Sequence, residues 1–200
     1  MCVSHIRSQR ETDREGKGAV KNILIGGIGN VLLGDDGVGP YIARFLDAHY
    51  TFEPGIEIAD LGTPALDLID QISGRDAVIL VDSVSIDAEP GTIVLYRKEE
   101  ITRLTPQVRM DPHSPALVET LLAAEMFGKT PAEVLLIGIV PQSFEAGCAL
   151  SDPVAEAVED AIAKILGELE RWGVAYQKKP QPDEISTWWT SEAALQALVS

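Results

Sequence analysis

The sequence predicts an α/β fold: a three-layer α/β/α sandwich with a mostly parallel sheet of about five strands. Three observations support this prediction. Short β-branched runs alternate with segments of helical periodicity, some runs are apolar throughout, and most are closed by glycine, proline or aspartate. A strand that is apolar at every position is typical of a parallel sheet covered on both faces. Alternating strands and helices then place helices on both sides of the sheet.

The first half of the chain contains three predicted strands and two predicted helices. The run ILIGGI is short and apolar, and it ends at Gly29-Asn30 as a strand that feeds a turn. In the first helix Ile42, Phe45 and Leu46 share one face, and Pro40 is tolerated in the first turn. The predicted strands are Ile23–Ile28, Ile56–Ile58 and Ala77–Val81, the last ending on Asp82, and the helices are Pro40–Tyr50 and Leu66–Ile72.

The second half continues the alternation. The helix that starts at Asp152 has an acidic first residue, Pro153 in its first turn and apolar residues at steps of three and four. A loop of about twenty residues precedes Ser114, and a loop of that length is usually functional or mobile. The predicted strands are Thr92–Tyr96 and Glu133–Val140, and the helices are Pro115–Phe127 and Asp152–Trp172.

A single domain with two extensions fits the length of 200 residues. Residues 1–21 are predicted to form a polar N-terminal arm, residues 22–174 the domain, and residues 175–200 a proline-rich tail with a possible short helix. Trp188 and Trp189 in this tail either anchor a partner or close over the protein's own surface.

Composition excludes several classes of function. A net charge of −15 and a pI near 4.5 disfavour nucleic-acid binding, which needs clustered lysine and arginine. No stretch is apolar enough to span a membrane and no secretory signal is recognisable, so we expect a cytoplasmic protein. We expect a monomer, because no extra apolar face is left unassigned. Cys2 and Cys148 lack the spacing of a zinc or redox site.

Common catalytic and nucleotide-binding motifs are absent. The loop after the first strand lacks the third glycine of a dinucleotide site, and there is no phosphate-binding GxxxxGK[ST] loop. There is also no GxSxG nucleophile and no HExxH zinc helix. His5 in the arm and His49 at a helix end are interpreted as solvent-facing or capping residues.

The candidate site consists of carboxylates at strand ends and one histidine. Asp35, Asp36 and Asp82 follow strands at the edge where open α/β sheets bind ligands, although Asp82 could instead cap a turn. His113 lies in the proline-braced segment DPHSP between a strand and a helix. Two carboxylates and one imidazole suit a divalent ion that keeps open positions for water or substrate.

The order of these motifs resembles the [NiFe] hydrogenase maturation endopeptidases over about residues 22–174. The resemblance is carried by GGIGNVLLGDDGVG at 26–39, Leu61-Gly62-Thr63, Val81-Asp82-Ser83, Pro90-Gly91-Thr92, His113 with the helix after it, and Gly138-Ile139-Val140-Pro141-Gln142-Ser143. Gly62 and Thr63 are predicted to shape the second loop of the site or to act as turn residues.

The resemblance implies an aspartic-type endopeptidase that removes the C-terminal extension of a hydrogenase large-subunit precursor once nickel has been inserted. It implies that Asp36, Asp82 and His113 bind nickel supplied by the substrate, with Asp36 where some members have glutamate. Asp36 or Asp82 would act as the catalytic base, and residues alone leave that choice open.

Two alternatives to the protease are considered. A non-catalytic assembly factor that checks for nickel would keep the three ligands and cut nothing. A small-molecule hydrolase or nucleotide-binding protein could use the same sheet, since fold does not determine function. The missing phosphate loop and the continuous family resemblance argue against this second alternative.

Overall fold

A mostly parallel sheet forms the centre of the protein. The computed structural model describes residues 22–64, 67–101, 109–110, 117–147, 149–185 and 187. Within this part of the chain, five strands follow the order β3-β1-β4-β7-β5, and a short β6 pairs with β4. Their bounds are β1 (Ile23–Ile28), β3 (Ile56–Gly62), β4 (Ala77–Ser85), β5 (Ile93–Arg97), β6 (Arg109–Met110) and β7 (Glu133–Ile139). Only β5 and β6 of this sheet are antiparallel to their neighbours, so the predicted fold class is confirmed.

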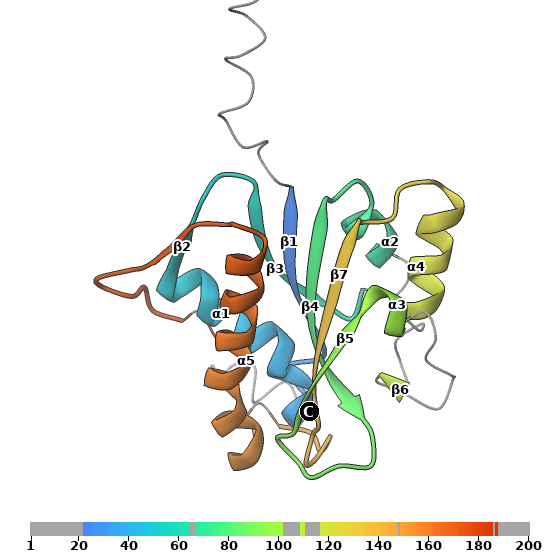
Figure 1. The fold of residues 1–200 in the computed structure, drawn as a ribbon. Helices are drawn as coiled ribbons and strands as arrows, with labels where there is room; N and C mark the ends of the chain where they lie inside the picture. The colour runs from blue at the N-terminus through green and yellow to red at the C-terminus, as the bar shows by residue number, and fades with distance from the viewer. Residues whose placement is uncertain are drawn as a thin grey trace, which may run out of the picture.

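Helices cover both faces of the sheet (Figure 1). α1 and α5 lie on one face, and α2, α3 and α4 lie on the other. Their bounds are α1 (Val38–His49), α2 (Leu68–Ile72), α3 (Lys98–Ile101), α4 (Leu117–Met126) and α5 (Asp152–Arg171). All four predicted helices are present, and their described ends differ from the predicted ones by no more than two residues. Among the described helices, none is both long and apolar enough to cross a membrane.

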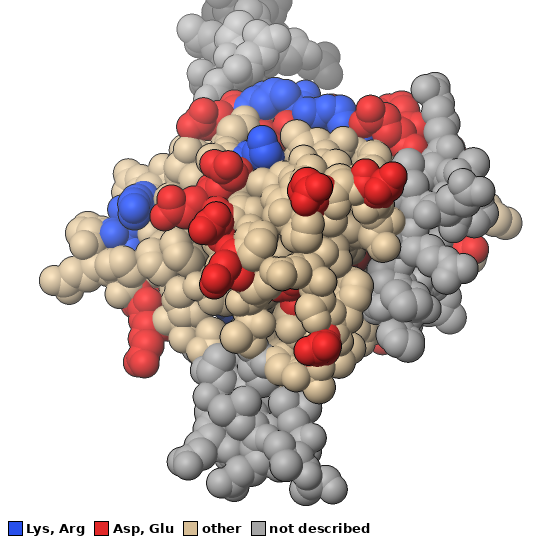
Figure 2. Space-filling model, turned by 90° about the horizontal axis from the view of Figure 1, so that it is seen from below, with Lys and Arg blue, Asp and Glu red and all other residues tan. Residues whose placement is uncertain are grey.

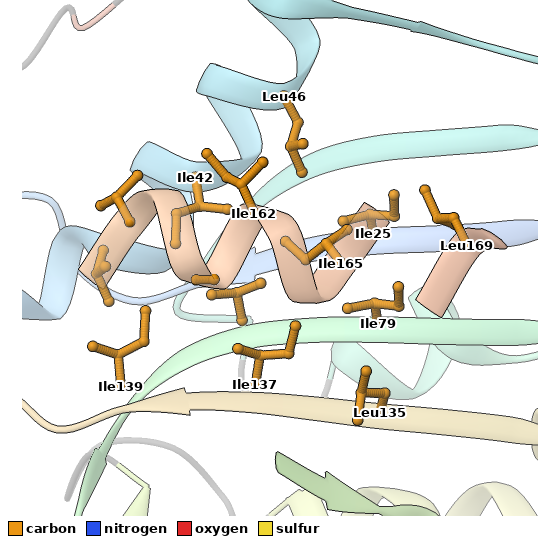
Figure 3. Packing of buried hydrophobic residues seen from close by; sticks show 14 of the residues in the cluster. Ile25, Ile42, Leu46, Ile79, Leu135, Ile137, Ile139, Ile162, Ile165 and Leu169 are labelled. Carbon is orange, nitrogen blue, oxygen red and sulfur yellow. The ribbon is translucent and has the colours of Figure 1, made fainter. Parts of the chain in front are cut away.

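The core consists of two apolar clusters separated by the sheet. Side chains alternate along β4, so Ile79 and Val81 face α1 and α5, whereas Leu80 and Val84 face α2 and α4. Figure 3 shows the first cluster, in which side chains of α1 and α5 meet those of the strands. Burying each of these large side chains stabilises the fold by about 1.5–3 kcal/mol. A shift of one strand by one residue in its pairing would therefore move its buried side chains from one face of the sheet to the other and disrupt both clusters.

β4 is longer than predicted, and this changes the position of Asp82. The strand was expected to end on Asp82, but it continues to Ser85. The additional residues have a backbone partner, because β6 pairs with Val84 and Ser85. Asp82 is therefore held inside a strand and does not cap a turn.

The segment predicted as one long loop after the fourth strand also contains regular structure. Residues 98–101 form α3, whose Ile101 is completely buried, and residues 109–110 form β6. A four-residue helix with one buried isoleucine has too little periodicity to be recognised from the sequence.

A second, two-stranded sheet ties the start of the predicted tail to the domain. β2 (Tyr50–Phe52) pairs antiparallel with β8 (Tyr176–Lys178), and Tyr176 lies 6.0 Å from Tyr50 and 6.2 Å from Phe52 between ring centroids. Tyr50 was predicted as the last helical residue and instead begins β2. The predicted arm (1–21) and the tail from Trp188 onward lie outside the described residues.

An ion-pair network connects α5 to the edge of the sheet. Glu168 of α5 is only 6% exposed, and both of its oxygens accept hydrogen bonds from Arg97 of β5 at 2.9 and 3.1 Å. Arg171 donates to Glu168 at 2.6 Å and to Glu133 of β7 at 2.7 Å. Burial alone would raise the pKa of Glu168, but the hydrogen bonds from both arginines outweigh it and lower the pKa to about 2.

Glu168→Gln is expected to lower the free energy of unfolding by about 2 kcal/mol near neutral pH, because the arginines lose their buried anion. The folded-state pKa lies below the ordinary value of 4.5. The carboxylate therefore stabilises the wild type above about pH 4.5, and this contribution is lost as the pH falls towards 2. Urea unfolding at neutral pH and near pH 3 measures both effects. The exposed Glu159→Gln on the same helix is the control, and equal losses in the two variants would contradict the prediction.

Candidate active site

The candidate site lies at the edge of the sheet where the parallel strands β1, β3 and β4 have their carboxyl ends. After β1 the chain turns at Gly29, passes through a short 3-10 helix (Gly34–Gly37) and enters α1. Gly29 has a φ of 133°, and a Cβ there would lie 1.8 Å from the backbone oxygen of Asp36. This glycine allows the loop to fold back tightly, which brings Asp36 against the end of β1.

Asp36 is a buried carboxylate with a defined orientation. It is 1% exposed. Its Oδ2 accepts a hydrogen bond from the Asn30 N–H at 2.7 Å, and its Oδ1 accepts one from the Ser83 hydroxyl at 2.7 Å. The first bond holds Asp36 to its own loop, and the second holds it to β4.

Asp82 is completely buried in β4, and its Oδ1 accepts the N–H of Ser83 at 2.8 Å. Ser83 therefore hydrogen-bonds both carboxylates, through its hydroxyl to Asp36 and through its backbone to Asp82. The structure thus links two of the three predicted residues through Ser83. Sequence reasoning did not select Ser83 or Asn30 as site residues, although both lie inside the motifs on which the resemblance rests.

His113 and Cys148 lie outside the described residues, as does His5. Among the described residues, no three histidine, cysteine, aspartate or glutamate side chains are grouped so that they could hold a metal ion. The assignment of Asp36, Asp82 and His113 to one metal site therefore stays a prediction. His49 stacks on Phe45 at 3.8 Å between ring centroids and its Nδ1 lies 2.9 Å from the Phe45 carbonyl oxygen, in agreement with a local role at the end of α1.

Asp35 has a different task from that of its neighbour Asp36. It is also 1% exposed, but its carboxylate accepts the N–H groups of Gln142, Ser143 and Ser151 at 2.7–3.1 Å. It also accepts the Ser151 hydroxyl at 2.9 Å. These bonds attach the segment after β7 and the start of α5 to the first loop, so Asp35 is a structural residue.

Asp35→Ala is expected to lower the free energy of unfolding by about 3 kcal/mol. The substitution leaves three backbone N–H groups and one hydroxyl without their charged acceptor. Chemical unfolding measures the loss, and Asp47→Ala, an exposed position on α1, is the control with an expected change within about 0.5 kcal/mol. A loss no larger than that of the control would contradict the structural role of Asp35.

Gly62 and Thr63 lie where the second loop was predicted. Gly62 ends β3 beside Ile28, and its carbonyl oxygen accepts the Gly29 N–H at 2.8 Å. Apart from Gly62 and its two chain neighbours, no described residue has an atom within 4 Å of the position that a Cβ on Gly62 would take. There is thus open space next to the first loop, in which another chain could approach the backbone.

The molecule is seen from the carboxyl edge of the sheet in Figure 2. Aspartate and glutamate are spread over the described part of this face, whereas lysine and arginine lie mainly towards its margins. Two oriented, buried carboxylates on such a face can bind a cation or accept a proton from water.

Comparisons with known proteins decide the family. The family model described as hydrogenase maturation protease matches residues 40–168, more than half of the chain. This chain belongs to the hydrogenase maturation protease family. Asp82 lies inside the matched range of the family, and Asp36 lies just before it.

Individual members of the family agree with this assignment. The chain is 33% identical over 153 residues to the hydrogenase 2 maturation protease of Escherichia coli K12, covering 76% of this chain and 93% of that protein. It is 35% identical over 158 residues to the hydrogenase expression/formation protein HupM of Azotobacter chroococcum, covering 78% and 76%.

Solved structures of the family show the same fold. The hydrogenase maturating endopeptidase HybD from Escherichia coli superposes with a TM-score of 0.74 at 32% identity, covering 79% of this chain and 98% of that one. The [NiFe] hydrogenase maturation protease HybD from Thermococcus kodakarensis gives a TM-score of 0.58 at 28% identity, covering 74% and 98%. The resemblance inferred from the motifs is therefore confirmed.

Proposed function

We propose that this protease is an endopeptidase that removes the C-terminal extension from the large-subunit precursor of a [NiFe] hydrogenase after nickel insertion. In this proposal Asp36, Asp82 and His113 bind the nickel that the substrate carries. Family membership supports the reaction class, and the names of the relatives connect such proteases with hydrogenase maturation.

The observation that carries the site assignment is the pair of buried carboxylates joined through Ser83. Because the hydrogen bonds orient Asp36 and Asp82 before any ligand arrives, little entropy is lost when a cation binds. Two carboxylate oxygens with one imidazole fit a divalent ion of borderline hardness and leave positions for ligands from the substrate.

The chemistry divides between the substrate-held metal and the chain. A divalent ion next to the scissile bond can polarise its carbonyl group and make a bound water more acidic. Asp36 or Asp82 accepts a proton from the attacking water in this proposal. Because cleavage requires the metal, only a precursor that already contains nickel is cut. Full cleavage by Asp36→Asn would exclude Asp36 as the base and assign that role to Asp82.

The test is incubation of the enzyme with nickel-loaded and nickel-free large-subunit precursor, followed by measurement of the precursor mass. We expect mass loss at the C-terminus only with nickel, and we expect His113→Ala to lose it while the control His49→Ala retains it. Binding of the nickel-loaded precursor without any mass loss would instead identify the non-catalytic assembly factor.

A further inference from the structure

A surface groove of about 570 Å³ lies between the start of β5 and the exposed side of α5. We call it the α5 groove and define it by Gly91 and Ile93 on one side and by Pro153, Glu156, Asp160 and Lys164 on the other. A Cβ on Gly91 would lie 2.5 Å from the Pro153 carbonyl oxygen, so the two sides meet at this end. Pro153 follows Ser151 closely, and Ser151 is bound to Asp35. The start of α5 lies at the edge of the sheet that carries the candidate site (Figure 1), so the groove begins at that edge.

β5 offers an open edge beside the groove. It pairs with β7 on one side, and no described strand pairs with its other side. The Arg97 N–H donates to the Glu100 side chain and not to β7. In an antiparallel pair, backbone groups point alternately towards and away from the neighbouring strand. The backbone groups of Leu95, two residues before Arg97, therefore also point away from β7. Its side chain is 43% exposed and lies on the α5 face, since Arg97 two residues later contacts Glu168. An open edge with an exposed leucine favours the addition of another strand.

The distance from this edge to the candidate site is short enough for one extended peptide to reach both. Asp82 is level with Gly138 of β7, and Gly138 is level with Val94 of β5. Neighbouring strands lie about 4.8 Å apart, so a strand added to β5 would lie roughly 14 Å from the backbone of Asp82. About four extended residues span that distance. A peptide bound at β5 would therefore begin about four residues from the bond that is cut.

Three charged side chains on α5 are spaced like alternate side chains of an extended strand. Glu156, Asp160 and Lys164 are exposed on successive turns, and none of them makes an ion pair with another described residue. Four helical residues rise about 6 Å, and alternate side chains of an extended peptide lie about 6.6 Å apart. Consider a peptide that lies along α5 and runs away from the edge that carries the candidate site. Every second side chain of this peptide would lie opposite one of the charged residues, first Glu156, then Asp160 and then Lys164.

We propose that the α5 groove binds the removed C-terminal extension of the substrate as a strand added to β5. At alternate positions of the peptide, the groove selects a basic side chain opposite Glu156, a second basic side chain opposite Asp160 and an acidic side chain opposite Lys164. This inference rests on the proposed function, because it takes the substrate to be a protein precursor cut at the neighbouring site. Main-chain hydrogen bonds to β5 supply affinity, and the side chains of α5 supply selectivity.

The first test compares cleavage of nickel-loaded precursor by the wild type and by the double variant Glu156→Lys/Asp160→Lys. Both positions are exposed, so the fold should tolerate the change. We expect KM to rise by about tenfold while kcat stays within about twofold, since the lost contacts lie away from the reacting bond. Glu159→Lys, an equally charged and exposed position of α5 outside the groove, should leave both constants unchanged. Equal KM values for the double variant and this control would overturn the inference.

The second test does not depend on cleavage. The probe is a seven-residue peptide of alternating valine and charged residues in the order lysine, lysine, glutamate, and its counterpart carries the opposite charges. We expect millimolar amounts of the first peptide to shift the amide NMR signals of Ile93 and Leu95, and the counterpart to shift them at least fivefold less. Absence of the shift overturns the inference even if the precursor is cleaved. A selective shift together with a precursor that is never cut supports the groove and rejects the proposed function.

Discussion

Asp82→Asn is expected to reduce nickel-dependent cleavage by roughly a hundredfold to a thousandfold without unfolding the protein. Asparagine has nearly the same size, and its oxygen can still accept the Ser83 N–H that now bonds to Asp82 Oδ1. The lost property is the negative charge that the proposed site needs for a cation or a proton. Cleavage is followed by the mass of the precursor, and folding by circular dichroism.

Asp76→Asn provides a matched control for this prediction. Asp76 precedes the other end of the same strand, is exposed, and accepts the Asn22 N–H far from the candidate site. Its substitution should leave cleavage unchanged within about twofold, because surface changes away from the site have small effects. Wild-type cleavage by Asp82→Asn would remove Asp82 from the catalytic site.

Gly39→Ala is expected to lower the free energy of unfolding by about 3 kcal/mol or more. A Cβ at this position would lie 2.3 Å from the Ile28 carbonyl oxygen and 2.4 Å from the Val81 carbonyl oxygen. Both are backbone atoms of the central strands β1 and β4, so they cannot move aside as a flexible side chain can. The first turn of α1 would have to move away from the sheet, and Asp36 lies two residues before that turn. Urea unfolding measures the loss of stability.

Gly167→Ala is the matched control, and it should change stability in the opposite direction. Gly167 lies within α5 and is exposed, and beyond its chain neighbours and the backbone of its own helix no described residue has an atom within 4 Å of the added methyl group. Alanine in an exposed helix interior is expected to stabilise the protein by about 0.5–1 kcal/mol. A similar loss for both variants would show that the close approach at Gly39 is not the cause.

Local sequence was sufficient for the elements that bury large apolar faces. β1 and α5 have the predicted starts, because a continuous apolar run and a long amphipathic period are strong signals. β2 and β8 were missed, since a three-residue strand is stabilised by a partner more than a hundred residues away in the sequence. The continuation of β4 past Asp82 was missed for a similar reason, because Ser83 pairs with β7 and Val84 and Ser85 pair with β6.

The sequence by itself determined the family and the α/β fold, since ordered motifs and periodicity are properties of the chain alone. Through the family resemblance it also predicted Asp36 and Asp82 as site residues. Only the tertiary structure showed what the two adjacent aspartates contact. Asp35 holds three segments together, and Asp36 reaches β4 through Ser83. Adjacent aspartates have the same chemistry, and their tasks differ only through the donors that folding brings to each. The α5 groove is likewise a product of folding, because its edge strand and its charged helix face are separated by some sixty residues of sequence.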